Sequence, residues 1–244
     1  MKLIIDIGNT RVKIAVFRED KILEIVNTEM LQLEQLQGLL IKYPNIKSAI
    51  LSAVKPYAEE VNSFLQAQLY FLKLDFSTPV PFKNLYRSPQ TLGKDRMAIA
   101  AASQALFPKE NVLAIVAGTT ITYDMVNQLG EYLGGSISPG IHMRFRALHT
   151  FTDQLPFVET RPGNEVSLIG VNTQQAIHSG VIQGVKAEVD GIIKQYRITF
   201  PDLRVVLGGG DYKYFDKRVK NNIFASPNIV LVGLKEILIF NEKK

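Results

Sequence analysis

The sequence predicts an α/β fold built from a duplicated unit. Short apolar runs typical of buried strands alternate with segments whose apolar residues recur at helical spacing. In addition, residues 3–12 (LIIDIGNTRV) align without gaps on residues 113–122 (LAIVAGTTIT). Both stretches read as an apolar strand, a glycine with small polar residues, and a second strand. This self-similarity indicates two lobes, near residues 1–110 and 111–244.

The individual elements follow from local patterns. Strands are expected at 3–7, 12–16, 19–29, 48–54, 70–74, 113–117 and 204–207, and helices at 28–43, 56–69, 97–106, from 141 onward and at 172–193. Pro56 is expected near the start of its helix, where proline is tolerated. Residues 79–92 are rich in Pro, Ser and Asn and predict a long irregular segment, which in a compact domain is often functional.

Composition favours an intracellular protein with anionic ligands. A net charge of +5 suits nucleotides, but Lys and Arg are scattered, and the densest group, residues 213–220, is expected to be a solvated helix face. We therefore expect no nucleic-acid partner. The absence of cysteine excludes disulfides and thiol catalysis. Because no apolar run resembles a signal peptide or a membrane span, we expect a soluble cytoplasmic protein without a membrane partner.

The turn after the first strand is a candidate phosphate site. Asp6 places a carboxylate inside an apolar strand, and Gly8 lets the chain turn so that backbone amides and the Asn9 and Thr10 side chains can face a phosphate. Such a group suits Mg²⁺ with ATP, because Mg²⁺ uses few protein carboxylates and bridges phosphate oxygens. An ordinary hairpin turn also explains these residues. The buried carboxylate, with Lys13 beyond the turn, favours the phosphate site.

A second candidate follows the irregular segment. Asp95 lies near a helix N-terminus, where a carboxylate can cap free amides. It could instead take a proton from a substrate hydroxyl while Arg96 binds an anionic group. Two glycine-rich stretches, 133–140 and 208–211, suit either turns or close backbone approach to a nucleotide. Thr173 is by default a helix N-cap, and the three histidines are isolated, with no spacing typical of a metal pair.

Taken together, these motifs resemble those of type III pantothenate kinases over nearly the whole chain, from Asp6 to Val232-Gly233-Leu234. The resemblance implies a duplicated ribonuclease H-like (actin-like ATPase) fold with two lobes of mixed sheets flanked by helices. It also implies ATP-dependent phosphorylation of pantothenate to 4'-phosphopantothenate, the first step of coenzyme A synthesis. A homodimer with the substrate site near its interface is expected as well.

Residue roles follow from the same resemblance. It assigns ATP contacts to Asp6, Ile7, Gly8, Asn9, Thr10, Arg11, Val12, Lys13 and Thr119, with Asp6 near Mg²⁺, through water. It makes Asp95 the catalytic base. Tyr86 and Pro89 with the Gly93-Lys94-Asp95-Arg96 motif resemble the pantothenate loop, and Thr173 resembles a substrate-binding threonine. Gly134-Gly135, Pro139-Gly140, Asn172 and the glycines at 208–210 with Asp211, the last of these an adenosine motif, complete the set.

Two departures from the family pattern concern the second lobe. The family usually has an aspartate that binds a monovalent cation where this chain has Val116, and valine cannot ligate K⁺ or NH₄⁺. The cation site is then lost, rebuilt from carbonyls or replaced. Leu207 stands where a threonine is frequent. Two other functions therefore remain open: another small-molecule kinase of this fold, against which the segment 86–96 argues, and a catalytically weakened regulatory relative.

Overall fold

The structure is a computed structural model that describes residues 1–215 and 223–243. The basic group expected at 213–220 therefore lies largely outside the described residues. The chain forms two compact units, one made of Met1–Leu106 with Ile229–Lys244 and the other of Phe107–Asn228. No helix in the described ranges combines the length and apolarity needed to span a bilayer.

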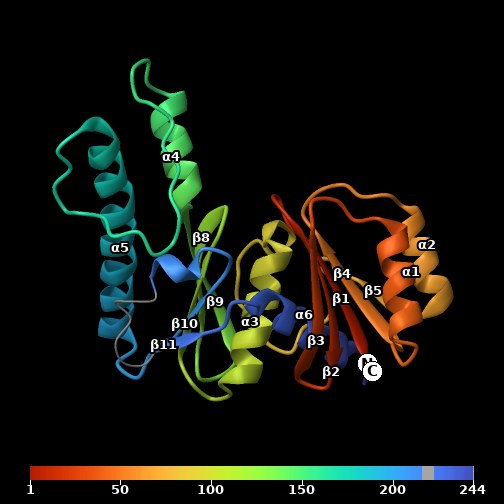
Figure 1. Cartoon of the computed structure of the whole chain (residues 1–244). Helices are drawn as coiled ribbons and strands as arrows, with labels where there is room; N and C mark the ends of the chain where they lie inside the picture. Colours follow the sequence, from red (N-terminus) through yellow and green to blue (C-terminus); the bar gives the residue numbers. More distant parts are fainter. Residues whose placement is uncertain (216–222, 244) are drawn as a thin grey trace. The chain divides into compact units, whose positions relative to one another are not determined.

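The first unit is built on a five-stranded mixed sheet in the order β3-β2-β1-β4-β5 (Figure 1). The first three strands form an antiparallel meander, and the other two lie parallel to β1. The strands are β1 (Lys2–Ile7), β2 (Val12–Arg18), β3 (Lys21–Thr28), β4 (Ser48–Ala53) and β5 (Tyr70–Lys73).

Both faces of this sheet are covered because its central strands are apolar on both sides. One face packs against helices α1 (Leu33–Lys42) and α2 (Glu60–Gln68) in a core that includes Ile5, Leu36 and Leu65. The other face receives α6 (Ile229–Glu242), which contacts β1 and β4, and α3 (Lys94–Leu106), which contacts β4.

Helix α2 begins later than the sequence predicted. Pro56 lies before the helix instead of in its first turn. The reason is that the Val54 amide donates a hydrogen bond to the Ile7 carbonyl (3.0 Å) and so extends the pairing of β4 with β1 beyond the strand. The irregular segment 79–92 contains only the short strand β6 (Lys83–Asn84) and a 3₁₀ turn, η1 (Pro89–Thr91).

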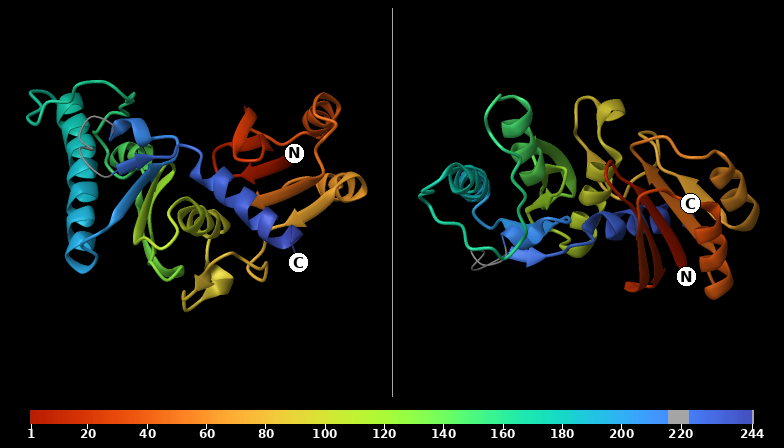
Figure 2. Two further views of the ribbon diagram at one scale, coloured as in Figure 1. Left: turned by 90° about the horizontal axis from the view of Figure 1, so that it is seen from below. Right: turned by 45° about the horizontal axis from the view of Figure 1, so that its top comes forward.

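The C-terminal helix belongs to the first unit, whereas the sequence boundary had assigned all of 111–244 to the second lobe. Helix α6 lies directly against α3, as both views in Figure 2 show. A Cβ atom at Gly233 would lie 1.7 Å from the Ala98 carbonyl oxygen, so the contact requires glycine on α6. This backbone contact between residues far apart in sequence could not be predicted from local composition.

The second unit repeats the same strand arrangement. Its strands lie in the order β9-β8-β7-β10-β11, with β7, β8 and β9 antiparallel and β10 and β11 parallel to β7. The correspondence with β3-β2-β1-β4-β5 confirms the predicted duplication into two mixed sheets flanked by helices. The strands are β7 (Val112–Ala117), β8 (Thr120–Val126), β9 (Glu131–Pro139), β10 (Arg204–Gly208) and β11 (Ile223–Ala225).

The repeat is not gapless. Four residues lie between Ile7 and Val12, which pair across the first hairpin, but only three lie between Ala117 and Ile121 in the second. The gapless alignment of 3–12 on 113–122 therefore ends at the turn, because the second turn is tighter by one residue. Its Gly118 amide bonds the Thr120 carbonyl (2.9 Å).

The glycine-rich stretch at 133–140 is a strand for most of its length. Gly134 and Gly135 lie inside β9, where a Cβ at Gly135 would come within 1.6 Å of the Tyr123 carbonyl oxygen on β8. Close approach of two strands explains this glycine. The remaining helices are α4 (Ile141–Thr150) and the long α5 (Thr173–Thr199), and the 3₁₀ turn η2 (Tyr212–Tyr214) follows β10 where a helix was expected.

Candidate active site

Two carboxylates, Asp6 and Asp95, are neighbours in the first unit. Asp6 lies on the face of β1 that α3 and α6 cover, opposite Lys13 on β2 and Ser52 on β4. Burial and then the Asp95 carboxylate raise the pKa of Asp6 to about 6, and Lys13 partly opposes them. Two neighbouring carboxylates with little access to solvent repel each other unless a bound cation or a proton offsets their charge. The pair is therefore a candidate site for both.

The carboxylate of Asp95 is fixed by its own helix terminus. It accepts a hydrogen bond from the Arg96 amide (2.9 Å) in the first turn of α3, so the capping contact expected from the sequence is present. The place it occupies is available only because residue 93 is glycine, since a Cβ there would lie 2.5 Å from Asp95 Oδ1. Capping and a role in chemistry are thus compatible, because the capping hydrogen bond uses Oδ1 of this carboxylate.

The substrate segment predicted around Asp95 also comes together in the first unit. The guanidinium of Arg96 is buried, at 4% exposure, and lies 5.7 Å from the centroid of the Tyr86 ring. Asn84 holds the Tyr86 amide through a 3.0 Å hydrogen bond, and Lys94 donates to the Ala53 carbonyl (3.1 Å). A buried arginine flanked by an aromatic ring suits an anionic group of a substrate.

A cavity of about 260 Å³ borders Lys94 in the same unit. Two further lysines, Lys55 and Lys73, line it, and Lys73 lies 5.5 Å from the centroid of the Tyr57 ring. The sequence analysis missed Lys55 and Lys73. Their position immediately after or at the end of parallel strands was the available signal, because ligands bind at the carboxyl ends of such strands.

The first turn presents backbone and polar side chains to solvent. The Gly8 amide bonds the Arg11 carbonyl (3.0 Å), and the Asn9, Thr10 and Arg11 side chains are exposed. Asp6 lies close to this turn in sequence, because only Ile7 separates it from Gly8. An exposed polar turn beside a half-buried carboxylate is the arrangement predicted for a phosphate with its metal ion.

In the second unit, two glycine-containing segments converge on the second turn. The Gly140 amide donates to the Thr119 carbonyl (3.1 Å), and a Cβ at Gly140 would lie 2.1 Å from the Gly118 oxygen. Gly209 has a φ of +89°, and its Cβ would meet the Ala117 oxygen at 2.1 Å. The two glycine motifs found in the sequence therefore support the turn that carries Thr119, whose side chain is exposed.

Val116 pairs with Thr122 across β7 and β8. The Thr122 side chain is 5% exposed, and its hydroxyl has no hydrogen-bond partner among the described residues. Val116 itself offers no oxygen to a cation. The residues at this position therefore do not form the carboxylate site that the family pattern would place there.

Helix α5 begins at Thr173, but the N-cap is Asn172, whose side chain accepts from the Gln175 amide (2.9 Å). The default role expected for Thr173 was therefore wrong, and its exposed hydroxyl remains available for a ligand. The described part of the chain contains no cluster of metal-ligating side chains, and the histidines make local contacts, as His178 does with the Glu159 carbonyl (2.9 Å).

One residue beside the carboxylates escaped the sequence analysis. Ser52 is 1% exposed and directly opposite Asp6, and within the described residues its hydroxyl has no hydrogen-bond partner. A serine near the carboxyl end of a mostly apolar parallel strand was the signal that could have identified it. A buried donor beside Asp6 can orient that carboxylate when the site is occupied.

Comparisons with known proteins agree with this geometry. Residues 2–195 match the family described as type III pantothenate kinase. Proteins named type III pantothenate kinase from Christiangramia forsetii and Phocaeicola vulgatus are 44% and 42% identical, covering 99% and 100% of both chains.

Solved structures share the fold at low identity. A Baf family protein from Campylobacter jejuni aligns with a TM-score of 0.62 at 21% identity, covering 99% of this chain and 100% of its own. The activator of 2-hydroxyisocaproyl-CoA dehydratase from Clostridium difficile, with bound ADPNP, gives 0.56 at 14%, covering 99% and 95%. With its duplicated fold, paired carboxylates and glycine-supported turns, the chain belongs to the type III pantothenate kinase family, whose members phosphorylate pantothenate with ATP in coenzyme A biosynthesis.

Proposed function

We propose that Asp95 is the general base of this kinase and takes the proton from the primary hydroxyl of pantothenate as that oxygen attacks the γ-phosphorus of ATP. The observation that carries the proposal is the placement of Asp95 beside Asp6 at the start of α3. Phosphoryl transfer depends mainly on positioning and charge stabilisation, so no covalent intermediate with the protein is needed. The bond between the γ-phosphorus and the bridging oxygen of ADP breaks, so that ADP leaves, the phosphoryl group ends on the substrate oxygen and the proton ends on the Asp95 carboxylate.

The phosphoryl donor, ATP, is assigned to the two glycine-containing turns at 8–11 and 118–120. We assign the ATP phosphates to Asp6, Ile7, Gly8, Asn9, Thr10, Arg11, Val12 and Lys13, and we assign Thr119 a further contact. The half-buried carboxylate of Asp6 beside an exposed polar turn fits Mg²⁺, held through water. When bound, Mg²⁺ would offset the charge on the phosphate oxygens. Lys13, in register with Asp6, adds a positive charge beside the same carboxylate.

For pantothenate we propose contacts with Tyr86, Gly93, Lys94, Asp95, Arg96 and Thr173. The Arg96 guanidinium, supported by the Tyr86 ring, is the natural partner of the pantothenate carboxylate. Gly93 serves by leaving room for the Asp95 carboxylate. The first unit would then carry the first phosphate turn and the substrate segment, and the second unit the second phosphate turn and the adenosine motif at 208–211.

A monovalent cation is not part of this proposal. The side chain at position 116 is apolar, and the residues paired with it on the neighbouring strands are Thr122 and Gly208. We propose that this chain works without the K⁺ or NH₄⁺ requirement implied by the family pattern.

Homodimer formation is a further part of the proposal. Leu168, Ile169 and Val171 are each more than 70% exposed and shortly precede Thr173 at the beginning of α5, and Phe151 at the end of α4 is exposed as well. Exposed apolar side chains gathered near a ligand residue are typical of an interface. We also propose a cytoplasmic location, which agrees with the use of ATP and the absence of cysteine.

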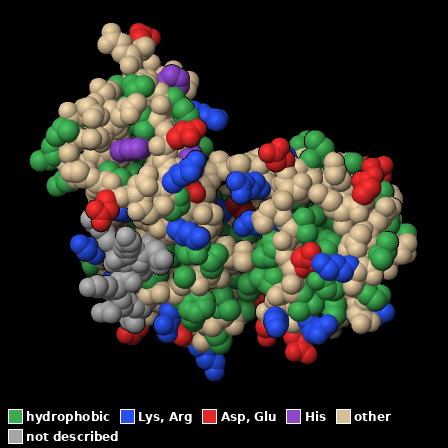
Figure 3. Space-filling model, viewed as in Figure 1, with side chains coloured by type: hydrophobic (Ala, Val, Ile, Leu, Met, Phe, Trp, Pro, Cys, Tyr) green, Lys and Arg blue, Asp and Glu red, His purple; other side chains and the backbone are tan. Residues whose placement is uncertain are grey.

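Lys and Arg side chains lie in several separate places on the face shown in Figure 3. We propose ATP and pantothenate as ligands, with no nucleic-acid or membrane partner. One rival function is kept open by Val116, namely a catalytically weakened regulatory relative, because a lost cation ligand is how such decay would begin. Another small-molecule kinase of this fold is the second rival.

The decisive experiment is to measure ADP release from Mg-ATP by the purified protein, with and without pantothenate. ADP release that depends on pantothenate supports the proposed kinase. Release that depends on a sugar, acetate or polyphosphate instead identifies another kinase of this fold. No release with any acceptor identifies the regulatory relative.

A further inference from the structure

A cavity of about 470 Å³ lies within the second unit, and part of its lining begins two residues after Asp211 of the adenosine motif. The segment 160–167, the middle of α5 and the residues just after Asp211 enclose it. Its volume falls in the range of small-molecule sites, roughly 300–1,000 Å³. None of the residues that line it has a role in the proposed reaction.

Cationic side chains dominate the lining. Arg161, Lys186 and Lys213 face the cavity, against a single carboxylate, Glu165, among the described lining residues. A concave surface with an excess of one charge concentrates ligands of the opposite charge. The cavity therefore favours an anion.

Two buried hydroxyls add hydrogen-bond donors. Thr160 is 7% exposed and Tyr214 is 9% exposed, and both line the cavity. Burial raises the pKa of Tyr214, and the neighbouring Thr160 hydroxyl acts to lower it. Neither hydroxyl has a hydrogen-bond partner among the described residues. Buried polar groups in folded proteins nearly always have a partner, so both hydroxyls are suited to a ligand's oxygens.

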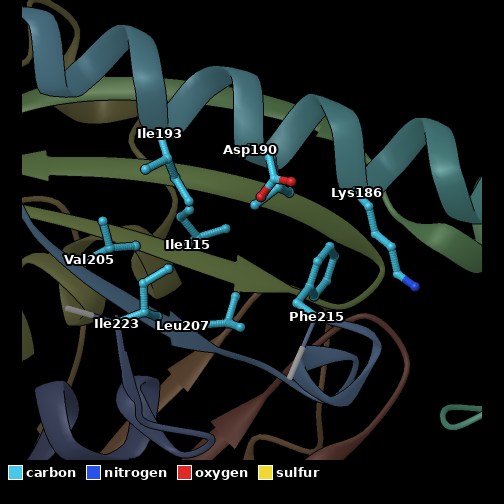
Figure 4. Close-up of a pocket in the computed structure, with 9 residues that line it drawn as sticks. Ile115, Lys186, Asp190, Ile193, Val205, Leu207, Phe215 and Ile223 are labelled. Carbon is cyan, nitrogen blue, oxygen red and sulfur yellow. The ribbon is translucent and has the colours of Figure 1, made fainter. Parts of the chain in front are cut away.

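The rest of the wall combines apolar side chains with the polar residues Asn164, Ser167 and Gln183. Ile182 and Val166 line the cavity. Lys186 and Phe215 border both this cavity and a small apolar gap next to it. Figure 4 shows that gap, with the Phe215 ring below α5 near Lys186. That gap, at about 10 Å³, has room for one water at most and is packing space. The larger cavity thus combines donors, positive charge and an apolar wall.

We propose that this cavity binds a small phosphate ester, separately from the phosphate-binding turns. The phosphate oxygens accept from the hydroxyls of Thr160 and Tyr214, and Arg161 and Lys213 offset the charge. The organic part of the ester packs against Ile182 and Phe215. The site is a second ligand site on the kinase, with no part in phosphoryl transfer.

The test is calorimetric titration of the purified full-length protein with ribose 5-phosphate, using ribose as the neutral control and repeating the titration with saturating Mg-ATP. We expect ribose 5-phosphate to bind, ribose not to bind, and Mg-ATP to leave the affinity unchanged. The double variant Arg161→Gln/Lys213→Gln should weaken binding by about tenfold or more, because two charge-assisted contacts are lost. Tyr214→Phe, which keeps the ring, should weaken it less.

Lys194→Gln is the matched control, since Lys194 is an exposed lysine on α5 that does not line the cavity. Three results would each overturn the proposal: no binding of ribose 5-phosphate, equal binding by the double variant, or displacement by Mg-ATP, which would make the cavity part of the nucleotide site. Because the arginine and lysine are exposed, the double variant decides the matter even if Tyr214→Phe fails to fold. The titration measures ribose 5-phosphate binding in the absence of pantothenate. A negative titration therefore contradicts this inference without bearing on the kinase assay, which measures pantothenate-dependent ADP release.

Discussion

Asp6 and Asp95 lie near each other in the first unit, and burial together with the Asp95 carboxylate raises the pKa of Asp6 to about 6. Asp6 comes from the central strand of the sheet and Asp95 from the first turn of α3. The fold keeps this repulsion although it costs stability, which is typical of a site that binds a cation.

Replacing Asp95 by Asn should reduce pantothenate-dependent ADP release by about 10²–10⁴-fold, the usual contribution of a positioned general base. Folding should be preserved, because the Asn oxygen can still accept the hydrogen bond from the Arg96 amide. Thermal unfolding checks the fold, and Asp202→Asn, in an exposed turn of the second unit, serves as the control. A near-normal rate for Asp95→Asn would remove Asp95 from the role of base.

The raised pKa of Asp6 predicts a pH-dependent stability. The folded protein holds the Asp6 proton more tightly than the unfolded chain, whose value is near 3.8. The contribution of Asp6 to the free energy of unfolding is therefore fully present below pH 3.8 and is lost as the pH rises through about 6.

Asp6→Asn mimics the neutral form and should exceed the wild type in stability above pH 6, by up to about 3 kcal/mol, with the difference vanishing near pH 4. Urea unfolding of both proteins in metal-free buffer across this range measures the difference. A constant difference at all pH values would contradict the shifted pKa.

Gly93→Ala should lower activity while leaving the fold intact. The added Cβ would lie 2.5 Å from Asp95 Oδ1, so the carboxylate must move. We expect a fall in kcat, measured by ADP release, because misplacing a catalytic group weakens the transition state.

Gly38→Ala is the matched control for this substitution. Gly38 lies inside α1, and a Cβ atom added there would have no neighbouring atom within 4 Å, so alanine should stabilise the protein by roughly 0.5–1 kcal/mol without changing the rate. Equal activity of both variants would mean that the position of Asp95 does not limit the reaction.

The monovalent cation is predicted not to matter for the wild type. ADP release should be the same in K⁺, NH₄⁺ and Na⁺ buffers of equal ionic strength, because Val116 cannot ligate a cation. Val116→Asp would place a carboxylate opposite the Thr122 hydroxyl and should make the rate depend on the cation. A strong K⁺ requirement in the wild type would instead indicate a site built from other oxygens.

Sedimentation should show a dimer at working concentration. Ile169→Arg introduces a charge among the exposed apolar side chains near the start of α5 and should shift the protein toward monomer. Ile41→Arg, at another exposed isoleucine in the first unit, should leave the assembly unchanged. A wild-type monomer would remove the dimer from the proposal.

Sequence patterns alone determined the parts of this protein that depend on local chemistry. The alternation of strands and helices, the duplication, and the glycine-containing turns at 8–11 and 118–120 follow from side-chain periodicity and from the conformations that glycine permits. The placement of Asp95 near a helix start was predicted in the same way. The element boundaries were less exact: α1 and α2 begin five and four residues later than predicted, α5 ends six residues later, and residues 131–139 form a strand.

Tertiary structure alone decided which residues distant in the sequence are in contact. The assignment of α6 to the first unit depends on the contact between Gly233 and Ala98, and the place of Ser52 opposite Asp6 depends on the register of two parallel strands. The shift in the pKa of Asp6 needs both burial and Asp95. Such facts join residues distant in the chain, and packing sets them only after every local element has formed, so no local pattern could contain them.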